Sequence, residues 1–448
     1  MTLSGHMKKR TVPGLLCFLA AIGLVAGACT IPFVFESRTL YYKFGMEKTL
    51  LRAAKMTGLI AFVMLLYQPF FVARFSFADR IFGLDRLYMY HKRNGVFLLL
   101  PAILHPVLIL ASEGFTLFPF EIRYWPEFLG VALLLLLAAA VVTAFFRSRL
   151  HMSWNVWAVL HKVLTILIFV MGFVHVKFVS SSFEGGIPTY CLYAAGLGVF
   201  FMLIAIFVRR SVLLSKKRNV VSVRQAGRDA CALEIAIPED EKRHRFPGQF
   251  IFAAFLSPEL PVEEHPFTIA SCPGNPDALQ LVIRAAGDYT DRIHRLSPGD
   301  RVCLDGPFGR FSHIFLNENT PVFMVAGGIG ITPMLSMLRH MRETGDQRRT
   351  VLLWSNRTPE HVIFPDEFET LCRDLPHLEI VHRFTRQANG NDCSGRIDPA
   401  LVRSILSGFE AKAAVFLCGP PGMARRVKGY VKQTGFSTAG VYTEQFVL

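Results

Sequence analysis

Four histidines lie inside strongly apolar segments, and they form two pairs with the same spacing. The pairs are His91 with His105 and His161 with His175, each fourteen residues apart. Fourteen residues make nearly four helical turns, so both members of a pair face one side, about 21 Å apart along the axis. That separation fits within a bilayer hydrocarbon core roughly 30 Å thick. Neutral imidazole binds iron without adding charge to an apolar site, so two such helices side by side could clamp two stacked haems.

The alternative is that each histidine hydrogen-bonds to a neighbouring helix. Four histidines at matched depths argue against it, because polar residues inside a membrane are costly. Two axial imidazoles leave no open position on iron, which favours electron transfer over oxygen binding at the metal. We expect His91 and His161 to hold an inner haem, and His105 and His175 an outer one. Three basic residues near the ligands either meet haem propionates or extend to the membrane interface: Lys92, Arg93 and Lys177.

A second chemical signal is a glycine-rich turn near residue 327. An apolar run at 322–326 enters this turn, and Thr332 with Pro333 then opens a predicted helix. Glycines let the backbone approach phosphate, and the helix N-terminus supplies oriented amides for the anion. The pattern is not the usual dinucleotide fingerprint, and such a turn can also be purely structural. The glycines that we expect to approach phosphate are Gly327, Gly328 and Gly330.

Two polar segments, 265–271 and 284–290, have the residue types that a flavin dinucleotide requires. Hydroxyls and a cation suit the pyrophosphate, and flat side chains suit the ring. The predicted pyrophosphate ligands are Thr268, Ser271, Arg284 and Thr290, and the predicted ring contacts are His265, Phe267 and Tyr289.

Two later strands end in residues that could contact a nicotinamide dinucleotide. Cys418 ends an apolar run and could touch the nicotinamide, although a buried strand cysteine explains it almost equally well. Ser355 and Arg357 follow another run and could bind a 2′-phosphate, which favours NADPH over NADH.

Six apolar stretches position the histidines and predict a six-helix membrane bundle. They cover residues 12–35, 53–73, 87–111, 128–146, 155–179 and 189–208, and the third and fifth contain the histidine pairs. The loops after the second, fourth and sixth stretches are basic, whereas the loop at 113–127 is more acidic. The positive-inside rule therefore places both termini in the cytoplasm.

The net charge and the cysteine spacing argue against other classes of protein. The net charge of +14 comes from basic residues clustered beside apolar spans, so we interpret them as topology signals and not as a nucleic-acid surface. The nine cysteines show no zinc or iron–sulfur spacing. The N-terminus could also be a signal peptide ending at Cys29, but its apolar run is longer than a usual signal core, which favours an uncleaved span. Met7 is an alternative initiator.

The soluble half divides near residue 318. Short β-rich runs broken by Gly and Pro predict an antiparallel β-barrel, and strand–turn–helix alternation then predicts a doubly wound α/β domain. We therefore expect three domains: a membrane domain at 1–214, a barrel at 215–317 and a nucleotide-binding domain at 318–448.

These motifs, taken in order, resemble those of the NADPH oxidase and ferric reductase family of transmembrane flavocytochromes. The resemblance covers roughly residues 53–448 and rests on the histidine spans and five motifs, whose members include Pro266, Gly287, Asp288, Gly419 and Pro420. It implies a ferredoxin-reductase-like soluble half, with FAD in the barrel and NADPH in the α/β domain. Tyr289 stands where the family has tryptophan and should still stack.

The family resemblance also implies a flavin-shielding aromatic residue near the C-terminus. The segment from Glu444 to Phe446 fits this role, with Phe446 as the aromatic residue. Val447 and Leu448 follow it, whereas oxidases of the family end at the aromatic residue. The implied cofactors are FAD, NADPH (with NADH as the alternative) and two b-type haems.

The implied activity is electron transfer from cytosolic NADPH to an acceptor outside the membrane. Oxygen, giving superoxide, is the favoured acceptor, and a chelated ferric ion is the alternative. A different class, a haem-binding sensor or electron conduit to a periplasmic protein, is disfavoured because the dinucleotide motifs are intact. No Asn-x-Ser/Thr sequon falls in an outward loop, which is compatible with a bacterial inner membrane.

Overall fold

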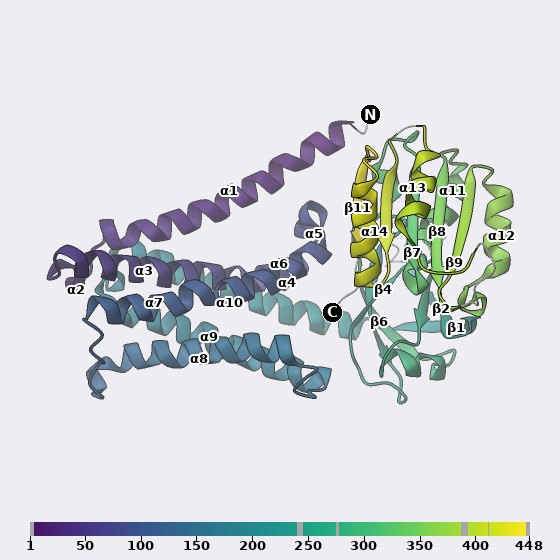
Figure 1. The fold of residues 1–448 in the computed structure, drawn as a ribbon. Coiled ribbons are helices and arrows are strands. Elements are labelled where there is room, and N and C mark those ends of the chain that lie inside the picture. The colour runs from purple at the N-terminus through teal and green to yellow at the C-terminus, as the bar shows by residue number, and fades with distance from the viewer. Residues whose placement is uncertain (1–3, 240–244, 275–276, 387–392, 411, 445–448) are drawn as a thin grey trace. The chain divides into compact units, whose positions relative to one another are not determined.

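The computed structural model describes residues 4–239, 245–274, 277–386, 393–410 and 412–444 (Figure 1). Its contacts divide the chain into two compact units, each described by itself. Lys8–Arg209 forms the membrane unit, and Arg210–Leu448 with Met1–Met7 forms the other, here called the dehydrogenase unit.

Six segments in the described chain are long and apolar enough to cross a bilayer, as predicted. They are Gly14–Val34, Gly45–Val72, Leu84–Ser112, Ile122–Phe146, Trp154–Val179 and Gly186–Ser215. Their main helices are α1 (Ser4–Val34), α3 (Gly45–Leu66), α6 (Leu84–Phe97), α7 (Leu99–Ser112), α8 (Trp125–Phe146), α9 (Trp154–Val179) and α10 (Gly186–Ser215), with shorter α2 (Arg38–Tyr41), α4 (Gln68–Val72) and α5 (Ser76–Phe82). Large apolar side chains along them are exposed, as lipid-facing surfaces require.

The third span is not the single continuous helix expected over 87–111. It breaks at Leu98 into α6, which carries His91, and α7, which carries His105. Pro101 has no N–H to donate to the carbonyl of Phe97, so the hydrogen-bond ladder is interrupted at the break. The direction of the His105 ring therefore depends on packing as well as on helical periodicity.

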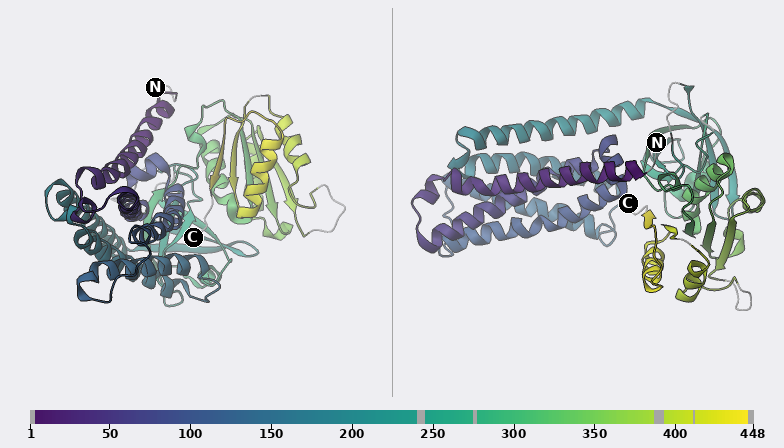
Figure 2. Two further views of the ribbon diagram at one scale, coloured as in Figure 1. Left: turned by 60° about the vertical axis from the view of Figure 1, so that its left-hand side comes forward. Right: turned by 90° about the horizontal axis from the view of Figure 1, so that it is seen from above.

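Packing within the membrane unit is pairwise. Helix α3 lies along α7, and α8 lies along α9, as the views in Figures 1 and 2 also show. A small apolar core joins these helices, and its buried members include Leu65, Leu98, Leu137, Leu164 and Phe169. Because α9 contributes to this core and carries two of the histidines, the core fixes the height of both.

The first part of the dehydrogenase unit is an antiparallel six-stranded sheet in the order β4-β3-β6-β1-β2-β5. Its strands are β1 (Arg218–Gly227), β2 (Ala230–Ala236), β3 (Phe250–Leu256), β4 (His265–Thr268), β5 (Ala278–Arg284) and β6 (Arg301–Phe308). A bridge between Ile269 and Leu281 joins the two edges, so the sheet curls into the predicted barrel. Strand β3 begins at Phe250, after a turn that contains Gly248 at a positive φ.

The second part is a parallel sheet in the order β11-β10-β7-β8-β9. Its strands are β7 (Val322–Gly327), β8 (Thr350–Asn356), β9 (Leu378–Phe384), β10 (Ala414–Cys418) and β11 (Gly440–Glu444). Alternate strand residues face opposite sides: Met324 packs with α11 (Thr332–Thr344) and α12 (Pro365–Asp374), whereas Phe323 packs with α13 (Pro399–Ser407) and α14 (Pro421–Gln433). Helices on both faces of a parallel sheet make the predicted doubly wound domain.

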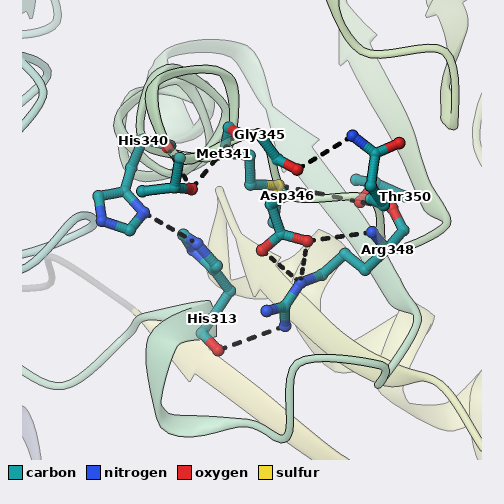
Figure 3. Close-up of polar contacts among 9 residues, drawn as sticks. His313, His340, Met341, Gly345, Asp346, Arg348 and Thr350 are labelled. Atoms are coloured by element: carbon teal, nitrogen blue, oxygen red, sulfur yellow. Dashed lines mark hydrogen bonds and ion pairs between the residues drawn. The ribbon is translucent and has the colours of Figure 1, made fainter.

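A buried histidine pair lies in this unit away from the dinucleotide motifs (Figure 3). His313 Nε2 is 3.3 Å from His340 Nδ1, and the guanidinium of Arg348 contacts both the His313 carbonyl and the carboxylate of Asp346. Burial, followed by the nearby Arg348 charge, lowers the pKa of His313 to about 3, and burial also lowers the pKa of His340. Both rings are therefore neutral in the folded protein near pH 7.

These lowered pKa values predict acid sensitivity. Unfolded histidine binds a proton below about pH 6.5 while the folded pair does not, so the free energy of unfolding should fall as pH decreases from there, by up to about 1.4 kcal/mol per pH unit for each ring. The measurement is the melting temperature of the detergent-solubilised chain between pH 7.5 and 5. His313→Gln keeps a donor toward His340 but cannot titrate, so its slope should be shallower. Equal slopes for the two proteins would refute the assignment.

Candidate functional site

The structure brings the four membrane histidines together in the two pairs that the sequence predicts. The ring centroids of His91 and His161 are 6.2 Å apart with planes at 81°, and those of His105 and His175 are 6.3 Å apart at 80°. In each pair one ring comes from α9 and the other from α6 or α7. The two pairs thus have nearly identical geometry.

This separation suits a metal held between two imidazoles. A metal–imidazole bond of roughly 2 Å, extended on each side by a ring radius of roughly 1 Å, puts two ring centres roughly 6 Å apart. Edge-to-face ring packing also covers this distance, so a metal is supported by two pairs that share nearly the same separation and angle. Among the residues that the structure describes, no group of three or more His, Cys, Asp or Glu side chains could hold a metal ion.

Backbone contacts orient the outer pair. The Nδ1–H of His105 donates to the carbonyl of Ala54 at 2.7 Å, and that of His175 donates to the carbonyl of Pro126 at 2.9 Å. Engaging Nδ1 in this way leaves Nε2 as the unprotonated nitrogen available to a metal. This hydrogen-bonding pattern is typical of histidines that ligate metals.

Two glycines give these rings room. A Cβ at Gly58 of α3 would lie 2.9 Å from His105 Nδ1, and one at Gly130 of α8 would lie 2.6 Å from His175 Cε1. Any larger residue would push the imidazole away from its partner. Sequence reasoning missed both positions, because the contacts join different helices.

We therefore expect Gly130→Ala to disturb the outer pair selectively. The added methyl should displace the His175 ring and reduce occupancy of the outer haem about 10-fold or more, as loss of ligand orientation typically does. Haem content and low-spin absorbance of the purified protein would measure this. Gly198→Ala is the matched control, because that glycine of α10 has open space around it. Full, unshifted absorbance from both haems in Gly130→Ala would contradict the prediction.

The inner pair lacks equivalent backbone bonds. The Nδ1 atoms of His91 and His161 are buried and have no partner within normal hydrogen-bond geometry in the described part of the chain, although the backbone of Gln68 lies near His91. The inner rings are oriented by packing instead, and His161 stacks on Trp157.

Lys55 is a buried cation near the outer pair that sequence reasoning missed. Its ammonium donates to Ser37 Oγ at 2.7 Å and to Ser180 Oγ at 2.9 Å, and it follows Ala54, the partner of His105, in the chain. Within the described ranges, no carboxylate lies within ion-pair distance of it. The predicted cation Lys177 instead donates to the Phe183 carbonyl and lies over the Tyr193 ring.

In the barrel, the predicted flat side chains form one cluster. His265 and Tyr289 have ring centroids 4.2 Å apart, and Phe267 lies beside His265. The carboxylate of Glu263 accepts a hydrogen bond from His265 Nε2 at 2.9 Å. Burial raises the pKa of the Tyr289 phenol, so this ring is neutral. The neighbouring Pro266 pairs with Phe252 in the sheet.

The predicted pyrophosphate ligands are only partly gathered. Arg284 pairs with Asp229 at 2.6 Å, and a Cβ at Gly328 would lie 2.6 Å from its guanidinium, so this barrel residue reaches the glycine turn. Thr290 bonds within its own turn, to the Ala286 amide and the Gly287 carbonyl beside Asp288. Two hydroxyl residues belong to the scaffold: Ser271 accepts from the Gln280 amide, and Thr268 is buried in β4.

The nucleotide-binding motifs meet at the carboxyl edge of the parallel sheet, where such folds bind ligands. Gly327 and Gly419 touch: a Cβ at Gly419 would lie 2.9 Å from the Gly327 amide nitrogen, and one at Gly327 would meet Pro420. Gly330 lies against the Cys418 carbonyl. Thr332 and Pro333 begin α11 directly after the glycines, as predicted.

Cys418 and Glu444 are buried neighbours, paired in register on β10 and β11. Burial, and then the Glu444 carboxylate, raises the pKa of the Cys418 thiol, which is therefore neutral and unsuited to nucleophilic attack. Contact between Cys418 and the nicotinamide stays a prediction. The other predicted C-terminal residue, Phe446, lies outside the described residues.

At the end of β8, Ser355 is half-buried and Arg357 is exposed. Between them is Asn356, which sequence reasoning missed. Its side chain is 4% exposed, and neither amide atom has a hydrogen-bond partner in the part of the chain that the structure describes. An unsatisfied buried amide beside a predicted ligand site marks a place for a polar ligand group.

Three segments of the chain match known sequence families. Residues 57–172 match the ferric reductase like transmembrane component, residues 215–312 an FAD-binding domain and residues 324–429 an oxidoreductase NAD-binding domain. Human dual oxidase 2 is 24% identical over 515 aligned residues, covering 94% of this chain and 32% of that protein. The reductase component of propane 2-monooxygenase from Mycolicibacterium goodii is 26% identical over 241 residues, covering 51% of this chain and 67% of that protein.

Among solved structures, a flavohemoglobin from Malassezia yamatoensis aligns over 90% of this chain and 99% of its own, with 15% identity and a TM-score of 0.49. Across three propane monooxygenase reductase components, the chain spans 60–67% of the relative's length.

The order of the three matched segments is a ferric-reductase membrane domain followed by FAD-binding and NAD-binding domains. In this order of matched domains, and in its similarity to dual oxidase 2, the chain resembles the NADPH oxidase and ferric reductase family of membrane oxidoreductases.

Proposed function

We propose that this chain carries electrons from cytosolic NADPH, through FAD and two bis-histidine haems, to molecular oxygen on the outer face of a bacterial inner membrane, giving superoxide. One observation supports the proposal above the others: both histidine pairs have the ring separation that suits a bound metal, in a chain that also contains FAD-binding and NAD-binding domains. When bound, FAD accepts hydride and releases single electrons, which haem carries one at a time.

Each part of the chain has a distinct task in this proposal. Cys418 and the glycines around it bind and orient the nicotinamide dinucleotide. His265 and Tyr289 form a flat surface for the flavin, and Arg284 supplies positive charge near its pyrophosphate. The basic loops support a cytoplasmic position for the dehydrogenase unit and both termini. The exposed Arg357 favours NADPH over NADH.

Ion pairing at the outer loops supports oxygen as the acceptor. Four cations of the predicted outer loops have the charge to attract superoxide or an anionic ferric chelate, but each is paired with a carboxylate: Arg38 with Glu184, Lys43 with Glu113, Arg52 with Glu36 and Arg123 with Glu121. Paired charges attract anions weakly. A small neutral molecule needs no such attraction.

The test uses proteoliposomes that enclose NADPH, with cytochrome c outside. We expect reduction of external cytochrome c that superoxide dismutase suppresses, together with oxygen consumption. Reduction that is insensitive to the dismutase, and faster with ferric citrate, would identify the alternative, a ferric-chelate reductase. Absence of outward electron transfer to either acceptor would reject the proposal.

A further inference from the structure

Trp157 lies beside the inner histidine pair, one helical turn before His161 on α9. The two rings are stacked, with centroids 5.2 Å apart and planes at 27°. The i, i+4 relation places both side chains on the same face of the helix. Trp157 thus lies between His161 and the end of α9 at which the basic 147–153 loop enters.

The indole nitrogen of Trp157 is a buried donor without an acceptor. Among the residues that the structure describes, Nε1 has no hydrogen-bond partner, although its atom is shielded from solvent. Buried polar groups are nearly always hydrogen-bonded, because an unsatisfied one loses water and gains nothing. An orphaned donor beside a predicted ligand site therefore points to an acceptor that binds there.

Arg147 adds positive charge at the same place. Its guanidinium carbon lies 5.0 Å from the Trp154 ring centroid and 5.9 Å from that of Trp157. In the described part of the chain, no carboxylate comes within ion-pair distance of this half-buried guanidinium. A cation held over two indoles next to an unused N–H makes a small site for an anion such as a carboxylate.

We propose that Trp157 and Arg147 bind a carboxylate of the inner porphyrin. The indole Nε1–H donates a hydrogen bond to the carboxylate, and the guanidinium neutralises its charge. The inference rests on the proposed function, because it requires a haem between His91 and His161. Both are positioning residues: they fix the porphyrin edge and, by placing positive charge beside it, make the inner haem easier to reduce.

The experiment compares four full-length variants by spectroelectrochemical titration. Trp157→Phe keeps a stacking ring but removes the N–H, Trp157→Leu removes both, and Arg147→Gln removes the charge. Trp125→Phe is the matched control, because it makes the same substitution at a tryptophan of the membrane unit that packs on Phe178 and lies outside the Arg147–Trp157 site. A His105→Ala background, which lacks one outer ligand, identifies the component that belongs to the inner haem.

We expect Trp157→Phe and Arg147→Gln to make the inner haem harder to reduce, by three- to tenfold in its equilibrium constant, where tenfold is 59 mV for a one-electron couple. The outer haem should be unchanged in both variants, and the inner haem should be unchanged in Trp125→Phe. If Trp157→Phe leaves the inner potential unaltered, the indole N–H does not bind haem; a shift confined to Trp157→Leu would show a purely packing role. Wild-type protein without any low-spin haem would instead overturn the proposed function itself.

Discussion

Replacing His175 with alanine should remove the outer haem and reduce electron transfer to the outer face by more than roughly 100-fold. The facing His105 would remain, with its Nδ1–H on the Ala54 carbonyl, but a single imidazole cannot complete a six-coordinate low-spin site. Transfer from NADPH to the flavin depends on residues of the dehydrogenase unit, so it should continue at the wild-type rate.

Two measurements separate these effects. Haem content per flavin should fall by half, and external cytochrome c reduction should be lost, while NADPH–ferricyanide reductase activity of the solubilised protein is retained. His151→Ala is the control, because this exposed histidine of the membrane unit belongs to neither pair. Normal outward electron flux in His175→Ala would show that the outer pair does not hold the redox group.

The second large effect is expected at Gly330. A methyl group there would collide with the carbonyl oxygen of Cys418, and both are backbone positions that cannot rotate away. Either the glycine turn or the end of β10 must shift, which moves Cys418 and Gly419 relative to a bound dinucleotide. A displacement of about 1 Å is enough to slow a positioned reaction about 100-fold. We expect Gly330→Ala to lower NADPH oxidation by that factor.

The defect in Gly330→Ala should be confined to the oxidation of NADPH. Chemical reduction with dithionite should still give the full spectrum of both haems, because the histidine pairs belong to the other unit. Gly422→Ala is the control, since this glycine of α14 has open space around it. Equal loss of NADPH oxidation in both variants would indicate general destabilisation and count against the packing argument.

The donor end and the acceptor end of the proposed electron path differ in the charge that favours electron transfer. An electron moving outward against an inside-negative potential must be supplied with about 2.3 kcal/mol per 100 mV, so the donor side must be strongly reducing. The neutral Cys418 thiol and the buried Glu444 carry no positive charge at the predicted nicotinamide site. At the outer side, Lys55 introduces a buried positive charge near His105. This arrangement favours release of electrons near Cys418 and their arrival near His105.

The sequence by itself determined the features that depend on local pattern. Six apolar stretches set the spans, and hydrophobic periodicity with Gly and Pro punctuation set the barrel and the doubly wound domain. The histidine spacing predicted which rings would meet, because helical geometry is regular over a few turns. The glycine turn at Gly327 and the helix start at Thr332 also follow from local backbone requirements.

Tertiary structure decided what depends on contacts between residues distant in sequence. The break at Leu98 had a local cause in Pro101, yet only tertiary packing, with α3 along α7 and α8 along α9, brings each ring about 6 Å from its partner. Space for His105 and His175 comes from glycines on other helices, and Asn356 and Lys55 gained significance only through burial. Spacing along a chain specifies direction and height on one helix, whereas distance between helices is set by the side chains that fill the gap.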